Sequence, residues 1–200
     1  MKATFFGDNM KKIIVFISCV IVVLLIYVIK NDKEVIYLEI SDKKIIGEKS
    51  VKYLSNKKML DEYIYLKNDN NYRLIDFYND IEKNKEFIFD GKEHTINNLF
   101  IKSDYIVLNI GYNEVDSLLK NELEPMKAID DFIDNYENII KTIRKITKEK
   151  IIIIFDYDLE TKYKDYLYNK MQLISNRYNC NMIYEFELLK LIKYFTNNKK

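Results

Sequence analysis

Two nearly continuous apolar runs, Tyr105–Ile110 and Lys150–Phe155, constrain the fold of this chain more than any other feature. Apolar runs without polar alternation are typical of parallel strands that helices cover on both faces. Residues 126–147 lie between them, with apolar residues at three- and four-residue spacing and a charged opposite side, which predicts an amphipathic helix. We therefore predict parallel strands joined by a helical crossover.

The rest of residues 35–196 continues this alternation and predicts one α/β domain. An Asp-Gly pair between β-prone segments predicts a hairpin over residues 86–96. Right-handed crossovers then favour a three-layer α/β/α sandwich with a five-stranded parallel sheet. The other predicted strands are Val35–Ile40, Tyr63–Leu66 and Asn181–Tyr184, and the other predicted helices cover residues 48–59, 74–82, 161–178 and 185–194.

Loops that follow the strands are the segments in which to look for function. In open parallel sheets, ligands bind beyond the carboxyl ends of the strands. This rule selects four segments, Ser41–Gly47, Lys67–Tyr72, Gly111–Glu114 and Asp156–Leu159.

Near the N-terminus, residues 13–29 are apolar and contain no charge, Gly or Pro. At about 1.5 Å per residue they span roughly 25 Å as a helix, near the lower limit for crossing a bilayer. We predict a short tail at 1–12 and a transmembrane anchor at 13–30. A cleaved signal peptide is an alternative, but the run ends in Tyr27-Val28-Ile29-Lys30 rather than in a small-residue cleavage site. A buried core helix is a further alternative.

The basic residues around this segment give a slight preference for a cytoplasmic N-terminus. Lys2, Lys11 and Lys12 precede the run, whereas Lys30 and Lys33 follow it among acidic residues. The prediction is a single-pass protein of the cytoplasmic membrane with an extracytoplasmic domain, held to lipid through residues 13–30.

Charge and cysteine usage narrow the function classes. The chain has 32 basic and 31 acidic residues, so it lacks the excess of cations that binding to nucleic acid requires. Cys19 and Cys180 fall in segments that cannot meet in a disulfide, and neither has a partner at metal-ligand spacing. No metal or other cofactor is predicted.

The loops also carry a family resemblance. Gly111-Tyr112-Asn113-Glu114, after an apolar strand, resembles the GxND block of the SGNH (GDSL-type) hydrolases, especially the membrane-anchored forms of low-GC Gram-positive bacteria. The matching segments are Ser41-Asp42-Lys43, Asn79-Asp80-Ile81 with Asn84, Gly91-Lys92, and Ser103-Asp104 through Glu114, within residues 35–187. The resemblance implies an SGNH/flavodoxin-like fold.

In that family, a Ser of the first block attacks an acyl ester, a late His acts as base and an Asp orients it, while backbone amides and an Asn stabilise the oxyanion. Here the nucleophile position falls on Lys43, and Ser41, two residues earlier, is an alternative nucleophile. The Gly of the second block falls on or near Asn71. Gly111 and Asn113 match the third block and are the predicted oxyanion or binding residues.

The late Asp-x-x-His block has no counterpart, because the only histidine of the chain is His94, beside the predicted hairpin turn. We interpret His94 as an exposed hairpin residue rather than as a relocated base. Asp156, Asp158 and Glu160 could hold a cation, but acids at this place more often cap a helix, here the one predicted to begin near Thr161. Serine catalysis without a base loses several orders of magnitude in rate.

These features predict an impaired SGNH-like domain that binds an envelope glycan or a protein partner. Whether the chain is an enzyme is left open. The alternative is a working esterase on envelope lipid or glycan esters, with Ser41 as nucleophile and Glu114, Lys43 or another subunit as base. A third possibility is a purely structural membrane protein that binds nothing.

Overall fold

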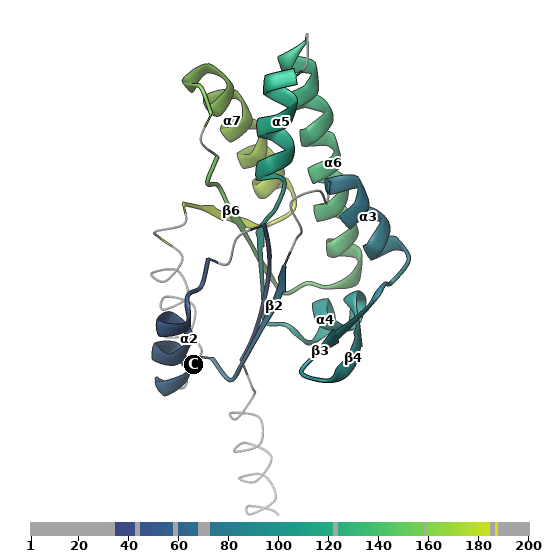
Figure 1. Ribbon diagram of the computed structural model, residues 1–200, viewed down its shortest axis with the longest axis vertical. Helices are drawn as coiled ribbons and strands as arrows, with labels where there is room; N and C mark the ends of the chain where they lie inside the picture. The colour runs from purple at the N-terminus through teal and green to yellow at the C-terminus, as the bar shows by residue number, and fades with distance from the viewer. Residues whose placement is uncertain are drawn as a thin grey trace, which may run out of the picture. The chain divides into compact units, whose positions relative to one another are not determined.

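A computed structural model shows an α/β fold in which helices flank a five-stranded parallel sheet (Figure 1). The structure describes residues 35–42, 45–57, 60–67, 73–121, 124–157, 159–184 and 187. The chain divides between Glu34 and Val35, and all described residues belong to the second unit. The predicted α/β class and five-stranded parallel sheet are thus confirmed.

The strand order is β2-β1-β5-β6-β7, with every neighbouring pair parallel. A separate antiparallel hairpin is formed by β3 and β4, as the Asp90-Gly91 turn predicts. The strands are β1 (Ile36–Ser41), β2 (Glu62–Lys67), β3 (Glu86–Phe89), β4 (Lys92–Thr95), β5 (Tyr105–Asn109), β6 (Lys150–Ile154) and β7 (Asn181–Ile183).

Six helices are described in the same part of the chain, and their amphipathic patterns explain where they lie. The long helix α6 buries residues such as Ile129, Phe132, Tyr136 and Ile140 at three- and four-residue spacing. The helices are α2 (Glu48–Asn56), α3 (Leu74–Glu82), α4 (Ile96–Lys102), α5 (Tyr112–Asn121), α6 (Pro125–Ile146) and α7 (Thr161–Arg177).

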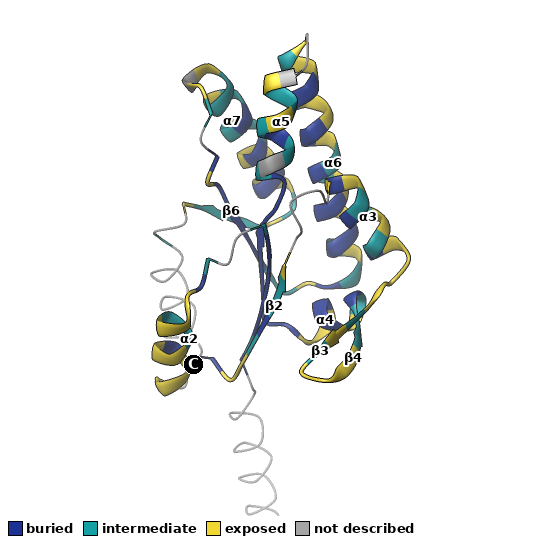
Figure 2. Ribbon diagram, in the orientation of Figure 1, coloured by how far each residue is buried: buried dark blue, intermediate teal, exposed yellow. Residues whose placement is uncertain are grey.

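Apolar side chains cover both faces of the sheet, so β5 is buried throughout and β6 is buried except at its first residue, Lys150 (Figure 2). On one face, Leu38, Ile106 and Ile153 belong to a core with residues of α3 through α7. On the other face, Tyr37 and Tyr105 stack with ring centroids 4.4 Å apart, in a core that includes Leu54 of α2. This double burial is the physical reason for the continuous apolar runs.

Two short helices were not predicted. α4 follows the hairpin, and α5 begins at Tyr112, inside the segment that we predicted to be a loop. The other predicted elements within the described residues occur with ends shifted by at most three residues.

Several predictions fall on residues outside the described part. These are the tail at 1–12, the anchor at 13–30 and the final helix at 185–194. Among the described residues, the structure contains no helix with the length and apolar character to cross a membrane.

Candidate functional site

The carboxyl edge of the sheet has a topological switch point between β1 and β5. After β1 the chain passes to α2 on one face, and after β5 it passes to α5 on the other face. Loops that diverge in this way leave room for a ligand between them, as in other sheets with this strand order. The segments at this place are those with the first and third blocks of the resemblance.

Asp42 connects these two segments. Its backbone N–H donates to the carbonyl oxygen of Asn109 at 3.0 Å, which extends the pairing of β1 with β5. Its Oδ2 accepts a hydrogen bond from the backbone N–H of Tyr112 at 3.1 Å. Tyr112 begins α5, so the carboxylate caps a helix N-terminus from another segment and complements its positive dipole end.

Glu114 makes the corresponding connection to the chain that follows β2. It is partly buried in the first turn of α5, and its Oε2 accepts from the backbone N–H of Leu74 at 2.7 Å. Leu74 begins α3, directly after the segment with the second block. We call the set of Asp42, Gly111, Tyr112, Glu114 and Tyr157 the switch-point site.

The environment of Glu114 alters its acidity. Burial raises the pKa of the Glu114 carboxyl above its ordinary value, whereas the hydrogen bond from Leu74 and the charge of Arg73 oppose this shift. The negative charges of Asp76 and Asp42 add to the upward shift. A carboxyl with a raised pKa beside the carboxyl edge of a parallel sheet is a candidate for binding or proton transfer.

Gly111 allows the chain to turn from β5 into α5. Its φ of +85° lies in the left-handed region that favours glycine. A Cβ at this position would lie 2.6 Å from Cε2 of Phe132, so the backbone also approaches α6 too closely for a side chain. The first residue of the GxND-like block thus has two structural reasons to be glycine.

Tyr157 lies beneath this turn. Its side chain is buried, and its hydroxyl donates to the carbonyl oxygen of Ile110 at 2.9 Å. Burial raises the pKa of the Tyr157 hydroxyl well above its ordinary value, and the charges of Asp42 and Glu114 add to the shift. The hydroxyl therefore stays protonated and holds the end of β5.

A buried carboxylate, Glu39, determines where Ser41 points. Glu39 accepts from the hydroxyl of Ser41 at 2.8 Å and from that of Tyr63 at 2.7 Å. It also accepts from the backbone N–H groups of Ile45 at 2.7 Å and Ile46 at 3.1 Å. Burial and the bond to Glu39 raise the pKa of the Tyr63 hydroxyl. Glu39 thus anchors the chain on both sides of residues 43–44.

Ser41, the alternative nucleophile, has no exposed surface. Side chains alternate along a strand, so Ser41 lies on the same sheet face as Glu39, toward which its hydroxyl is directed. The nucleophilic role of Ser41 stays a prediction.

The other predicted site residues are only partly within the described structure. Lys43 and Asn71 lie outside the described residues. Asn113 has its backbone in the first turn of α5, but its side chain lies outside the described part. The structure does bring together their described neighbours Asp42, Leu74 and Glu114.

His94 lies at the opposite edge of the sheet. It is partly exposed in β4 and pairs with Phe87 of the hairpin, which leads through α4 to the start of β5. The five residues of β5, about 16 Å at 3.3 Å per residue, separate that edge from Gly111. The interpretation of His94 as a hairpin residue agrees with this placement.

The acidic segment after β6 contributes little that is described. Asp158 lies outside the described residues, and α7 has Glu160 at its N-cap position with no side-chain capping bond. The acidic cap predicted at Asp158 therefore stays a prediction. Within the described ranges, no group of three or more His, Cys, Asp or Glu side chains could hold a metal ion.

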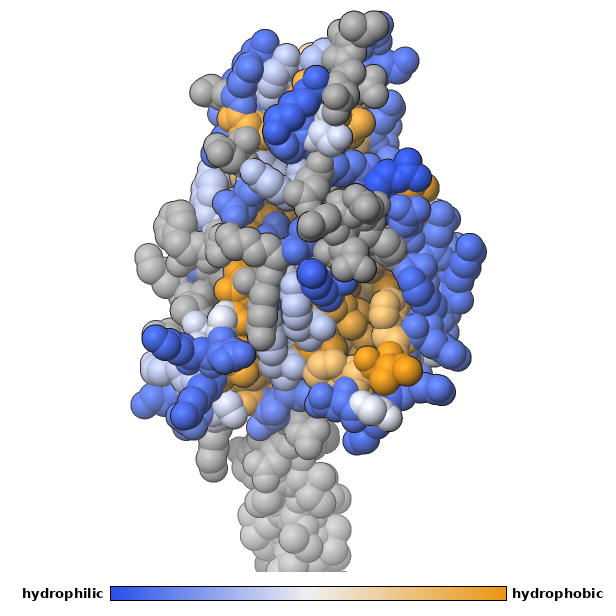
Figure 3. Space-filling view, in the orientation of Figure 1, coloured by the Kyte–Doolittle hydropathy of each residue, from blue (hydrophilic) through white to orange (hydrophobic). Residues whose placement is uncertain are grey.

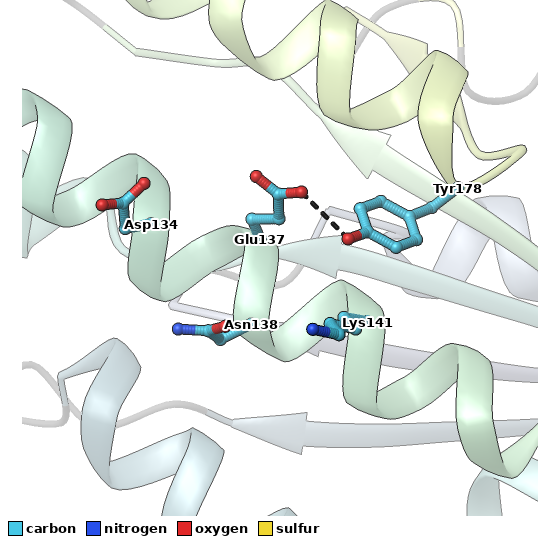
Figure 4. A pocket seen from close by; sticks show the side chains of 5 residues that line it. All are labelled: Asp134, Glu137, Asn138, Lys141 and Tyr178. Carbon is cyan, nitrogen blue, oxygen red and sulfur yellow. Dashed lines mark hydrogen bonds between the residues drawn. The ribbon is translucent and has the colours of Figure 1, made fainter.

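A separate surface groove of about 290 Å³ lies along α6 (Figure 4). Tyr178, which follows α7, donates to Oε1 of Glu137 at 2.9 Å across it, and Arg177 pairs with the same carboxylate. The groove belongs to none of the loops at the carboxyl edge. Its lining residues are Asp134, Glu137, Asn138, Lys141 and Tyr178.

Sequence reasoning missed the contributions of Glu39 and Tyr157. A glutamate inside an otherwise apolar strand was the available signal for Glu39, because a buried charge needs partners. Tyr157 gave no such signal, since tyrosine occurs at 17 positions of the chain.

Comparison with known proteins does not identify a family: no family model matches the chain, and no curated protein matches it significantly.

Proposed function

We propose that the chain is a membrane-anchored, SGNH-hydrolase-like protein whose switch-point site binds a neutral, hydroxyl-rich envelope glycan without hydrolysing it. One observation supports this most: two carboxylates join the flanks of all three family-like blocks at the switch point. Asp42 bonds to Tyr112, and Glu114 bonds to Leu74. The described flanks of the segments that the resemblance selects therefore meet at the edge of the sheet where this topology binds ligands.

The charges of the site favour the ligand class. Carboxylates accept hydrogen bonds, so Asp42 and Glu114 suit a ligand with many hydroxyl or amide donors and repel phosphate groups. The partly exposed ring of Tyr112, 6.3 Å from that of Tyr157, adds an aromatic surface for the apolar face of a sugar. A glycan combines these two properties.

Binding without turnover follows from the positions of the reactive groups. The Ser41 hydroxyl is buried against Glu39, and the only histidine of the chain lies at the other edge of the sheet. A serine without a base retains only the rate enhancement that binding and oxyanion donors provide. The predicted anchor at residues 13–30 would hold this domain at the outer face of the cytoplasmic membrane.

Isothermal titration of the full chain in detergent with an N-acetylglucosamine oligomer tests the proposal. Asp42→Asn and Glu114→Gln keep an oxygen acceptor but remove a charge, so we expect about 10-fold weaker binding in each. Glu62→Gln, at an exposed position of β2, serves as control and should bind like the wild type. Equal affinity in all four proteins would contradict the proposed site.

The second candidate is an active esterase that uses Ser41, with Glu114 as base. The raised pKa of Glu114 favours it, because a general base works best with a pKa near the operating pH. A fluorophosphonate probe that labels the wild type but not Ser41→Ala would establish this alternative. Absence of labelling would remove it.

A further inference from the structure

We infer that the β3–β4 hairpin and α4 carry a surface that rests on the lipid bilayer. We define this hairpin surface by the exposed side chains of Ile88 in β3 and Ile101 in α4. This surface is separate from the switch-point site. The inference depends on the proposed function, because it requires the membrane anchor at residues 13–30. Its occupant is a lipid surface rather than a protein.

Two isoleucines, one in the hairpin and one in α4, are exposed to solvent although their apolar neighbours pack into the core. In β3, Phe87 and Phe89 pack against the core, while Ile88 between them is 77% exposed. In α4, Leu99 and Phe100 are buried, while Ile101 is 59% exposed. Figure 3 shows an apolar patch over the region where Figure 1 places α4 and the hairpin. Exposed apolar patches mark interaction sites.

The hairpin surface lies at the edge of the sheet at which β1 begins (Figure 1). Shortly after α4, the backbone N–H of Asp104 donates to the carbonyl oxygen of Ile36 at 2.9 Å. In return, the N–H of Ile36 donates to Oδ2 of Asp104 at 3.1 Å. The short connection between α4 and β5 is therefore bonded to the start of β1.

The length of the connecting segment limits how far this edge can be from a membrane. Only residues 31–34 separate the predicted anchor from Val35. Four extended residues reach at most about 14 Å. A domain tethered so closely by this edge brings its hairpin surface within reach of the lipid interface.

The charges around the hairpin indicate what kind of contact this is. Residues 83–95 contain three lysines and three carboxylates. Lys85 also pairs with Asp80 at 2.7 Å. With this balance, attraction to anionic lipid is weak, and burial of the isoleucines at the interface is the driving contact.

Tryptophan reporters test the inference, because the natural chain contains no tryptophan. Ile88→Trp and Ile101→Trp are placed in the full chain and reconstituted into neutral phosphatidylcholine vesicles with or without brominated acyl chains. Met126→Trp is the control. Met126 is 43% exposed in the first turn of α6, at the opposite edge of the sheet.

We expect Ile88→Trp and Ile101→Trp to lose at least half of their tryptophan emission in brominated vesicles and Met126→Trp to lose almost none. The quenching should persist in high salt. Equal quenching at all three positions, or none at 88 and 101 in protein that floats with the vesicles, would overturn the inference. If the protein does not float with the vesicles, it lacks the membrane anchor, and the inference is overturned for that reason. Glycan binding is measured separately in detergent, so that result would leave it unaffected.

Discussion

At the scale of single residues, a comparison of Gly111 with Gly91 distinguishes two destabilising effects of replacing a glycine, backbone strain and steric overlap. Both have positive φ, but a Cβ meets Phe132 at Gly111 and nothing within 4 Å at Gly91. We expect Gly91→Ala to lower the free energy of unfolding by about 1 kcal/mol through backbone strain alone. Gly111→Ala should lose about 2–4 kcal/mol, because overpacking adds to the strain. Urea unfolding measures the free energy of unfolding of both variants. Equal losses would show that the Phe132 side chain moves aside without cost and would contradict the expected overpacking.

Glu39 is the residue whose loss should damage the region of the site most. In Glu39→Gln, one oxygen becomes an amide that donates, yet four donors surround the position. At least one buried donor is left without an acceptor, so we expect a loss of about 2–3 kcal/mol in urea unfolding. The exposed Glu62→Gln should change stability by less than about 0.5 kcal/mol. A similar small change at Glu39 would contradict the described bonding.

Glu114 predicts a specific pH dependence. Its pKa in the folded state is raised above the ordinary value of 4.5, so between these two values the folded chain binds more protons than the unfolded chain. Stability contributed by Glu114 is therefore lost as the pH rises through this window. Glu114→Gln replaces the carboxyl with a group that does not titrate. As the pH rises above 4.5, the free energy of unfolding of this variant should fall less than that of the wild type. Parallel curves would contradict the raised pKa.

At the scale of elements, Arg144 connects α6 to two chain reversals. Its guanidinium donates to the carbonyl oxygens of Tyr178 at 2.8 Å, Glu149 at 2.5 Å and Asn179 at 2.8 Å. Lysine cannot reproduce this planar arrangement, so Arg144→Lys should cost about 2 kcal/mol in urea unfolding.

Arg177→Lys is a suitable control for this change. Arg177 is 61% exposed in its surface ion pair with Glu137, and such pairs contribute little. We expect its free energy of unfolding to change by less than about 0.5 kcal/mol. If both variants lost equal stability, the connection through Arg144 would not be the cause.

The same scale shows what the sequence could and could not predict about the fold. β5 and β6 were predictable, because burial on both faces leaves an apolar run that no other element matches. α4 and α5, with 7 and 10 residues, were not. Length is not the reason, because α2 and α3 have 9 residues each and were predictable. α4 begins directly after β4, and only Ile110 and Gly111 separate α5 from β5, so no loop marks where either helix begins. Packing of Phe100 and Val115 into the core stabilises them.

At the scale of the whole molecule, the sequence indicated that the site lies at the carboxyl edge of the sheet, but not which hydrogen bonds connect the loops there. The loops after β1 and β5 were predictable from the strand order. The roles of Asp42 and Glu114 were not, because their partners Tyr112 and Leu74 lie 70 and 40 residues away. Such partners become neighbours only once the strands are arranged.

One NMR titration tests the central claim that the switch-point site binds a glycan without turnover. An O-acetylated N-acetylglucosamine oligomer is mixed with the full chain in detergent, while saturation transfer to sugar protons and release of free acetate are followed in the same sample. We expect saturation transfer that weakens in Asp42→Asn, with no acetate above the protein-free control. A growing acetate signal that disappears in Ser41→Ala, or no transfer at all, would contradict it.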